Sequence, residues 1–355
     1  MHAAALTAAL KERCREEGFD AVGVASAEPL VRDVAALESW LDAKHHASME
    51  WMEKTRERRA EPGKVLSGCR SVVIVALNYW PGEELTQAAP GQARVALYAQ
   101  ARDYHKVIGA KLKRVARWLD EQNASESRSF VDTAPVLERG WAQRAGIGWI
   151  GKNANLLTTT MGSWVLLGEL LTTAELVPDS GPHADHCGSC RACIDACPTD
   201  AIISEGRVDA NRCISYWTIE HRGSVPIERR AGNGDWIFGC DICQTVCPWN
   251  ETHATEVSAE HHERRAGLSG LDAVEILALD EATFRERYSG TPLMRAKWEG
   301  MRRNACIVLA ASLDARAEGA LREALEDADD VVREHARWAL ETRLASGIGT
   351  DVPLS

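Results

Sequence analysis

Eight of the eleven cysteines in this chain lie within 61 residues, and their spacing constrains the fold more than any other feature. The first four follow the pattern C-x2-C-x2-C-x3-C-P, at Cys187, Cys190, Cys193 and Cys197. A second run repeats this pattern without its first cysteine, at Cys240, Cys243 and Cys247. In bacterial ferredoxins such a run supplies three thiolates to one [4Fe–4S] cluster and a fourth to the other. The sequence therefore predicts two clusters.

Cys213, the eighth cysteine of this segment, can supply the ligand that the second run lacks. One predicted set is then Cys187, Cys190, Cys193 and Cys247, and the other is Cys197, Cys213, Cys240 and Cys243. A pair of zinc sites is the alternative, because four-cysteine zinc also uses C-x2-C, but zinc does not need the x3-Cys-Pro ending. In a reducing compartment such clustering indicates metal rather than disulfides.

The length of 355 residues suits two or three packed units. Hydrophobic residues make up 45% and charged residues 26%, which excludes wholesale disorder. No apolar stretch is long enough for a membrane span, and the first residues lack the features of an export signal. We therefore expect a cytoplasmic protein. Twelve Trp against four Phe is unusual, and some of these rings could line a large ligand or simply fill the core.

Hydrophobic patterns divide the chain into an α/β part at 1–180, a cluster-binding part at 181–250 and a helical part at 251–355. The β-branched run Ser71–Asn78 predicts a buried strand. Further strands are expected over 130–133 and 163–171, and helices over 4–17, 103–123 and 138–145. Helices over 304–312, 317–325 and 330–344 resemble HEAT-type repeats. The predicted fold class is α+β.

Charge is distributed unevenly along the chain. With 41 Lys and Arg against 52 Asp and Glu, the net charge of −11 excludes a globally basic nucleic-acid binder. Two segments are nevertheless basic, residues 102–117 and residues 285–303. Each could be an ordinary solvated helix face, but together they favour one face that binds RNA phosphates.

Several motifs outside the first cysteine run carry a family resemblance: VDT at 131–133, AGIG at 145–148, KN at 152–153, RCIS at 212–215 and GCDICQTVCP at 239–248. Together they resemble the epoxyqueuosine reductases, tRNA-modifying enzymes that complete queuosine synthesis. The resemblance covers nearly the whole chain. It implies a cobalamin-binding α/β domain related to that of reductive dehalogenases, a ferredoxin-like domain with two [4Fe–4S] clusters and a HEAT-like C-terminal region.

The resemblance also implies the activity, which is reduction of the epoxide of epoxyqueuosine at the wobble position of tRNAs with GUN anticodons. The enzyme would act as a monomer that uses cobalamin and a low-potential electron donor. Asp132 would be the proton donor, and it must then hold a proton near neutral pH. The alternative for Asp132 is a helix cap ahead of Pro135.

Two groups of contact residues follow. The cobalamin contacts implied by the resemblance are Arg59, Asp132, Lys152, Asn153, Asn155, Leu156, Thr158, Leu167, Ser215, Cys240 and Asp241. A splayed wobble base needs aromatic and basic partners. The candidate tRNA contacts are Tyr216, Trp217, Arg222, Arg295, Lys297, Arg302 and Arg303.

A dinucleotide site is rejected, and two alternative functions stay open. The segment 146–151 fits G-x-G-x-x-G, but it follows a predicted helix and lacks the acidic ribose-binding residue of a dinucleotide site. Its glycines are expected instead to let the backbone approach a large flat cofactor. A corrinoid reductive dehalogenase and a pure iron–sulfur electron carrier are the alternative functions.

Overall fold

The structure is a computed structural model that describes all residues except 1, 83–91, 183, 258–264, 266 and 349–355. The chain forms two compact units. Unit 1 comprises residues 1–83, 103–210 and 242–263, and unit 2 comprises residues 84–102, 211–241 and 264–355. This grouping differs from the three consecutive parts expected above, because the cysteine-rich segment contributes to both units.

A four-stranded antiparallel sheet lies at the centre of unit 1, in the order β1-β2-β7-β4. Its strands are β1 (Ala21–Ser26), β2 (Ser71–Asn78), β7 (Val165–Thr172) and β4 (Ser127–Phe130). All eight residues of β2 are buried, since alternate side chains enter cores on both faces of the sheet. The predicted strand over Ser71–Asn78 is confirmed.

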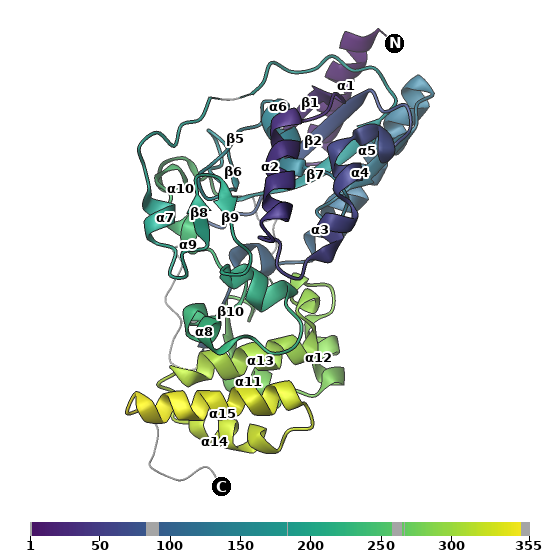
Figure 1. The fold of residues 1–355 in the computed structure, drawn as a ribbon. Coiled ribbons are helices and arrows are strands. Elements are labelled where there is room, and N and C mark those ends of the chain that lie inside the picture. Colours follow the sequence, from purple (N-terminus) through teal and green to yellow (C-terminus); the bar gives the residue numbers. More distant parts are fainter. Residues whose placement is uncertain (1, 83–91, 183, 258–264, 266, 349–355) are drawn as a thin grey trace. The chain divides into compact units, whose positions relative to one another are not determined.

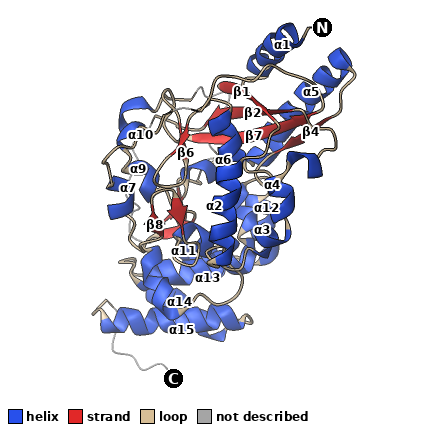
Figure 2. Ribbon diagram, turned by 45° about the horizontal axis from the view of Figure 1, so that its top comes forward, coloured by secondary structure: helices blue, strands red, loops and turns tan. Residues whose placement is uncertain are grey.

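Helices cover both faces of this sheet (Figure 2). The core on one face joins β2 to α1 (Ala3–Glu16) and α5 (Tyr104–Asn123) through Leu10, Ile108 and Val75. The core on the other face joins β2 to α6 (Glu138–Arg144) through Trp141 and Ile74. The helices predicted over 4–17, 103–123 and 138–145 are thus confirmed to within a residue or two at each end.

Short elements complete unit 1. Its remaining helices are α2 (Val31–Asp42), α3 (Glu50–Lys54), α4 (Arg56–Ala60), α7 (Ala192–Asp195), α9 (Ile242–Thr245) and α10 (Pro248–His253). Its remaining strands form two hairpins, β5 (Trp149–Ile150) with β6 (Leu156–Leu157) and β8 (Ile202–Ser204) with β9 (Arg207–Val208). The cysteine motifs lie in and beside α7, α9 and α10.

Unit 2 packs helices on a small sheet, in the order β10-β3-β11. The strands are β3 (Gln92–Val95), β10 (Trp236–Phe238) and β11 (Gly270–Asp272). The helices are α8 (Ile227–Arg230), α11 (Ala273–Ala278), α12 (Glu281–Tyr288), α13 (Lys297–Ala310), α14 (Ala317–Glu323) and α15 (Asp330–Ala345), and Tyr216–Glu220 forms one π-helical turn. Figure 1 shows α11, α13, α14 and α15 stacked against one another. Helix α13 lies in the middle of this core, and the predicted HEAT-like helices are present.

One predicted strand is wrong. The strand β4 ends at Phe130, and residues 131–137 form an irregular loop before α6 instead of continuing to residue 133. Asp132 has a φ of 55°, a left-handed conformation that a β-strand cannot contain. None of the described helices has the length and apolar character that a membrane span requires.

Candidate active site

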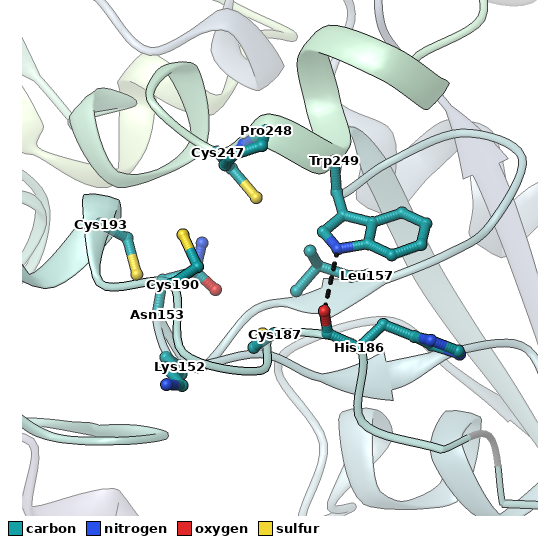
Figure 3. A pocket seen from close by; sticks show the side chains of 10 residues that line it. All are labelled: Lys152, Asn153, Leu157, His186, Cys187, Cys190, Cys193, Cys247, Pro248 and Trp249. Carbon is teal, nitrogen blue, oxygen red and sulfur yellow. Dashed lines mark hydrogen bonds between the residues drawn. The ribbon is translucent and has the colours of Figure 1, made fainter.

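The four cysteines of the first predicted set line one cavity of about 250 Å³ in unit 1. Cys187 and Cys190 come from the segment leading into α7, Cys193 lies within α7, and Cys247 immediately precedes α10. Figure 3 shows the sulfurs of Cys190, Cys193 and Cys247 turned toward one another. A water molecule takes about 30 Å³, so the thiols enclose space for a group of many atoms. Because cysteine sulfur is the usual ligand of iron–sulfur clusters, the cavity fits a [4Fe–4S] cluster.

Aromatic rings pack at one side of this cavity. The ring centroid of Trp249 lies 4.8 Å from that of Trp149 and 5.4 Å from that of His186. The indole Nε1 of Trp249 donates to the carbonyl oxygen of His186 at 3.4 Å (Figure 3). Trp149 is buried, and its indole lies near enough to the Cys187 thiol to act against the rise that burial causes in the pKa of that thiol. Part of the tryptophan excess therefore surrounds the cluster cavity.

Lys152 and Asn153 also line the cavity. The Nζ of Lys152 donates to the carbonyl oxygen of Gly188 at 2.7 Å and pairs with Glu205 at 2.8 Å. The amide of Asn153 donates to the carbonyl oxygen of Cys243 at 3.1 Å. Both residues were expected at the cobalamin. In the structure they brace the backbone on either side of the cluster cavity.

The second predicted ligand set draws on both units. Cys197 and Cys243 belong to unit 1, whereas Cys213 and Cys240 belong to unit 2. The sulfur of Cys197 accepts a hydrogen bond from the backbone N–H of Ala201 at 3.3 Å, and the Asn155 amide lies 4.0 Å from the Cys243 sulfur. Such N–H donors stabilise ligating thiolates. The contacts fit a ligand role for these two residues, and the complete second set stays a prediction.

A second group of polar side chains surrounds Asp132, in the loop between β4 and α6. The Tyr104 hydroxyl donates to Oδ2 of Asp132 at 3.0 Å, and Nε2 of His105 lies 3.3 Å from the same oxygen. Tyr104 and His105 begin α5, which Asp103 caps by accepting the N–H of His105. The Asp132 side chain remains 52% exposed, so a substrate can reach it. Since α6 begins six residues later, the alternative of a helix cap is wrong.

His105 and Asp132 form an ion pair. Burial alone lowers the pKa of His105, but its contacts with Asp103 and Asp132 raise that pKa to about 9. Desolvation raises the pKa of Asp132, but the charge and hydrogen bond of His105 and the Tyr104 hydroxyl outweigh it and leave that pKa below its usual range. At neutral pH the pair therefore holds one proton, on His105, in contact with an accessible carboxylate.

Comparisons with known proteins decide the family. A family profile described as "Epoxyqueuosine reductase QueG, DUF1730" matches residues 59–133, and one described as "4Fe-4S double cluster binding domain" matches residues 186–250. The epoxyqueuosine reductase of Vibrio cholerae is 40% identical over 337 residues, covering 94% of this chain and 90% of the relative. The chain belongs to the epoxyqueuosine reductase family. Membership confirms the resemblance and the expected oxidoreductase, and the second profile confirms the predicted double-cluster domain.

Other members of the epoxyqueuosine reductase family agree in sequence and in fold. The enzyme of Synechococcus sp. (strain CC9605) is 43% identical, covering 84% of this chain and 93% of the relative. A crystal structure of an epoxyqueuosine reductase with an epoxyqueuosine-modified tRNA-Tyr stem loop is 30% identical. It superposes with a TM-score of 0.88, covering 95% of this chain and 90% of that chain. The predicted fold class is confirmed.

The other residues predicted to contact cobalamin in this epoxyqueuosine reductase family member lie in different parts of the fold. Arg59 is buried, and it donates to the carbonyl oxygen of Val136 at 3.1 Å, so its guanidinium braces the Asp132 loop. Thr158 closes a turn onto the carbonyl oxygen of Gly162 at 3.1 Å. Leu156 and Leu167 belong to the sheet core. In unit 2 lie Ser215, Cys240 and Asp241, and buried Asp241 accepts the N–H of Leu97 at 2.7 Å. Their contacts with cobalamin stay predictions.

The glycines of the G-x-G-x-x-G segment serve the chain itself. A Cβ on Gly148 would lie 1.9 Å from the carbonyl oxygen of Leu157, and one on Gly151 would lie 2.2 Å from the Leu157 side chain. Gly146 has a φ of 75° just after α6. The expectation that these glycines face a flat cofactor is wrong, because they admit the close β5–β6 pairing.

The side chains predicted to contact RNA form an exposed group and a buried group. Arg222, Arg295 and Lys297 are exposed. Arg303 is buried and donates to the carbonyl oxygens of Trp217, His221 and Gly223, while buried Arg302 pairs with Asp327. Tyr216 and Trp217 are also buried, at 5% and 7% exposure. These four side chains support the interior of unit 2, so we leave them out of the proposed RNA contacts.

Sequence reasoning missed four residues around Asp132. Tyr104 and His105 were part of a predicted helix, and only their place directly after the capping Asp103 could have set them apart. Glu138 and Glu169 were likewise read as helix and strand residues. The signal for Glu169 was present in the segment SWVLLGELL, because an acidic residue within a buried apolar strand needs a partner or a raised pKa.

Proposed function

We propose that this protein reduces epoxyqueuosine to queuosine at the wobble position of tRNAs with GUN anticodons, the last step of queuosine synthesis. The observation that carries the proposal is the accessible Asp132 carboxylate held by Tyr104 and His105 in a chain that also builds a cluster cavity. The reaction breaks both C–O bonds of the epoxide, forms a C=C bond and releases the oxygen as water. It consumes two electrons and two protons.

The two cysteine sets would hold the clusters that pass electrons from the donor to the site. Two [4Fe–4S] clusters carry one electron at a time, as the double-cluster profile supports. Bound cobalamin would supply a strongly nucleophilic, reducing metal centre. The residues of unit 1 that would hold it include Asp132, Arg59 and Asn155, which would offer a carboxyl, a guanidinium and an amide to its polar edge. The electron donor would be a low-potential one-electron carrier.

The His105–Asp132 pair supplies a proton to the departing oxygen. Tyr104 orients Oδ2 of Asp132, and protonated His105 holds the proton that the carboxylate needs. A proton transferred in the transition state typically contributes about 10²–10⁴-fold in rate. A structure of the Bacillus subtilis epoxyqueuosine reductase, 29% identical to this chain with a TM-score of 0.88, is described with its catalytic aspartate loop swung out of the active site. We assign the same role to the Asp132 loop.

The exposed basic cluster Arg222, Arg295 and Lys297 is proposed to contact tRNA phosphates. Arg222 donates to the backbone carbonyl oxygen of Arg295 at 2.6 Å, the Arg295 guanidinium pairs with Glu220 at 2.7 Å, and Lys297 is the first residue of α13. Lys297→Ala should weaken binding of the stem loop and reduce its salt dependence, as measured by fluorescence anisotropy. Arg337→Ala, on the exposed side of α15, is the control and should leave binding unchanged. We further propose a cytoplasmic monomer.

The decisive experiment is a single turnover of reconstituted protein with an epoxyqueuosine-containing stem loop under strong reduction, followed by nucleoside analysis. Wild type should yield queuosine. Asp132→Asn should lower the rate by at least about 10²-fold while cluster absorbance and cobalamin binding persist. Asp42→Asn, an exposed carboxylate at the end of α2, should match wild type. Unchanged nucleoside in wild type would refute the function, and full activity in Asp132→Asn would refute only the acid assignment.

A further inference from the structure

Two carboxyl side chains meet beneath the Asp132 loop. Glu169 lies in the middle of β7, where its register partners are Ile74 on β2 and Phe130 on β4. Its side chain is 1% exposed and shares the sheet face of Leu167 and Leu171. Glu138 begins α6, the helix that covers this face, and its carboxyl lies within hydrogen-bonding reach of that of Glu169.

The surroundings of Glu169 require a proton on this pair. Among the described residues, Oε1 of Glu169 is buried without any hydrogen-bond donor. Two carboxylates in contact away from water repel each other, so one of them keeps its proton. Burial raises the pKa of Glu169 well above its ordinary value, and the neighbouring charge of Glu138 raises it further. The protonated Glu169 carboxyl therefore donates to Glu138.

Glu138 is the less buried member of the pair, since its side chain is half-buried whereas that of Glu169 is 1% exposed. Burial and the negative charge of Asp132 raise its pKa to about 7, whereas Arg139 and Arg59 act in the opposite direction. The groups around the pair are thus Asp132 in the loop, Arg59 on α4 and Arg139 on α6. A group that titrates near neutral pH can both release a proton and regain it, which suits proton transfer in an active site.

The proposed reaction needs more protons than the described ion pair holds. Breaking two C–O bonds and releasing water takes two protons, and His105 with Asp132 carries one at neutral pH. We propose that the Glu138–Glu169 pair stores the second proton and returns it to Asp132, so that both glutamates act as positioning residues behind the proton donor. This inference rests on the proposed function. The reductant supplies both electrons, and the transfer moves only protons among Glu169, Glu138, Asp132 and the departing oxygen.

A purely structural role for the pair predicts something different. Two buried acids that only fill space would change protein stability when replaced, but not the pH at which the rate falls. Glu169→Gln keeps the shape and offers an amide N–H to Glu138, which favours ionised Glu138. The pair then loses its proton at a lower pH. The pH dependence of the rate therefore distinguishes a glutamate pair that stores a proton from a pair that only fills space.

The first measurement does not depend on turnover. Infrared spectra of the full-length protein at about pH 8 should contain the carbonyl stretch of a buried protonated carboxylic acid. The Glu169→Gln spectrum should lack this band. The control Glu175→Gln replaces an exposed glutamate that follows β7 and pairs with Arg70 at the surface, and it should retain the band. A wild-type spectrum without the band would overturn the proposal.

The second measurement is the single-turnover rate between about pH 6 and about pH 9. Glu169→Gln should react within about twofold of wild type at the acid end and about tenfold more slowly at about pH 8. Glu138→Gln should be slower across the whole range, and Glu175→Gln should follow wild type. A Glu169→Gln profile parallel to that of wild type would overturn proton storage. If wild type formed no queuosine at all, the proposed function would fail instead, whatever the infrared band shows.

Discussion

The phenol oxygen of Tyr104 lies 3.0 Å from Oδ2 of Asp132, which joins the first residue of α5 to the loop before α6. Asp132 needs this anchor because its backbone has a φ of 55° and no strand or helix holds it. The same oxygen faces His105 at 3.3 Å, so two consecutive residues of one helix fix both the position and the charge of the carboxylate.

Tyr104→Phe removes the hydroxyl donor and leaves the ring. The Asp132 carboxyl then loses one orienting contact, and we expect the single-turnover rate to fall by about tenfold. Tyr98→Phe, which changes a phenol in unit 2, is the control for a general effect of losing a hydroxyl. Equal rates for Tyr104→Phe and wild type would show that His105 alone positions the carboxylate.

His105 should set the alkaline limit of the reaction. Its folded-state pKa of about 9 exceeds its usual value, so the imidazole stays charged at neutral pH and loses its proton as the pH rises through about 9. The wild-type single-turnover rate should therefore decline near pH 9. In His105→Gln this alkaline decline of the rate should begin at a lower pH. Rate profiles of both proteins test this. An alkaline limb at the same pH in both would assign the titration to another group.

Replacing one ligand of the cavity should remove one cluster. Cys193→Ser deprives the first set of a thiolate, so elemental analysis should find about half of the wild-type iron. Cys69→Ser is the control, because Cys69 lies outside both sets and its thiol donates to the carbonyl oxygen of Ser71 at 3.6 Å. Zinc in place of iron in the wild type would contradict the cluster assignment.

Trp149 should tune the first cluster. Its buried indole nitrogen has no hydrogen-bond partner among the described residues, and it lies near enough to the Cys187 thiol to act against the rise that burial causes in the pKa of that thiol. Because an N–H donor at a ligating sulfur raises the reduction potential, Trp149→Phe should lower it on the order of tens of millivolts. Trp249→Phe is the matched control, since that indole donates to a carbonyl oxygen. Redox titration followed by electron paramagnetic resonance measures both, and identical potentials in Trp149→Phe and wild type would contradict this role.

The features that the sequence predicted well are local ones. The cysteine spacing predicted that the first set would meet at one cavity, because three of its four members lie within seven consecutive residues. The strand Ser71–Asn78 was predicted to the residue, since a run buried on both faces leaves a continuous apolar signal. Long-range packing was harder to predict. Arg303 was predicted to belong to a basic patch that binds RNA. Only the structure shows that its guanidinium donates to three backbone carbonyl oxygens inside unit 2.

The Asp132 loop was mispredicted for a related reason. The apolar Phe130 and Val131 continue the pattern of β4, and nothing in the sequence marks the left-handed backbone at Asp132. The partners of this residue come from α5, α4 and α6, which are distant in the chain, so a pattern along the sequence cannot bring them together. Only the chemistry of single residues, such as an acid within an apolar strand, could have drawn attention to the site.

The sharing of one cavity between distant cysteines has a consequence for how the protein is made. Cys247 follows Cys193 by 54 residues, so a ribosome must synthesise all of the intervening chain before the last thiol of the first set is available. We therefore expect delivery of iron and sulfide to this proposed set to be a late event in biogenesis. An inserted cluster would hold Cys193 and Cys247 together and so close a long loop of chain. Oxidative damage to the cluster would open that loop.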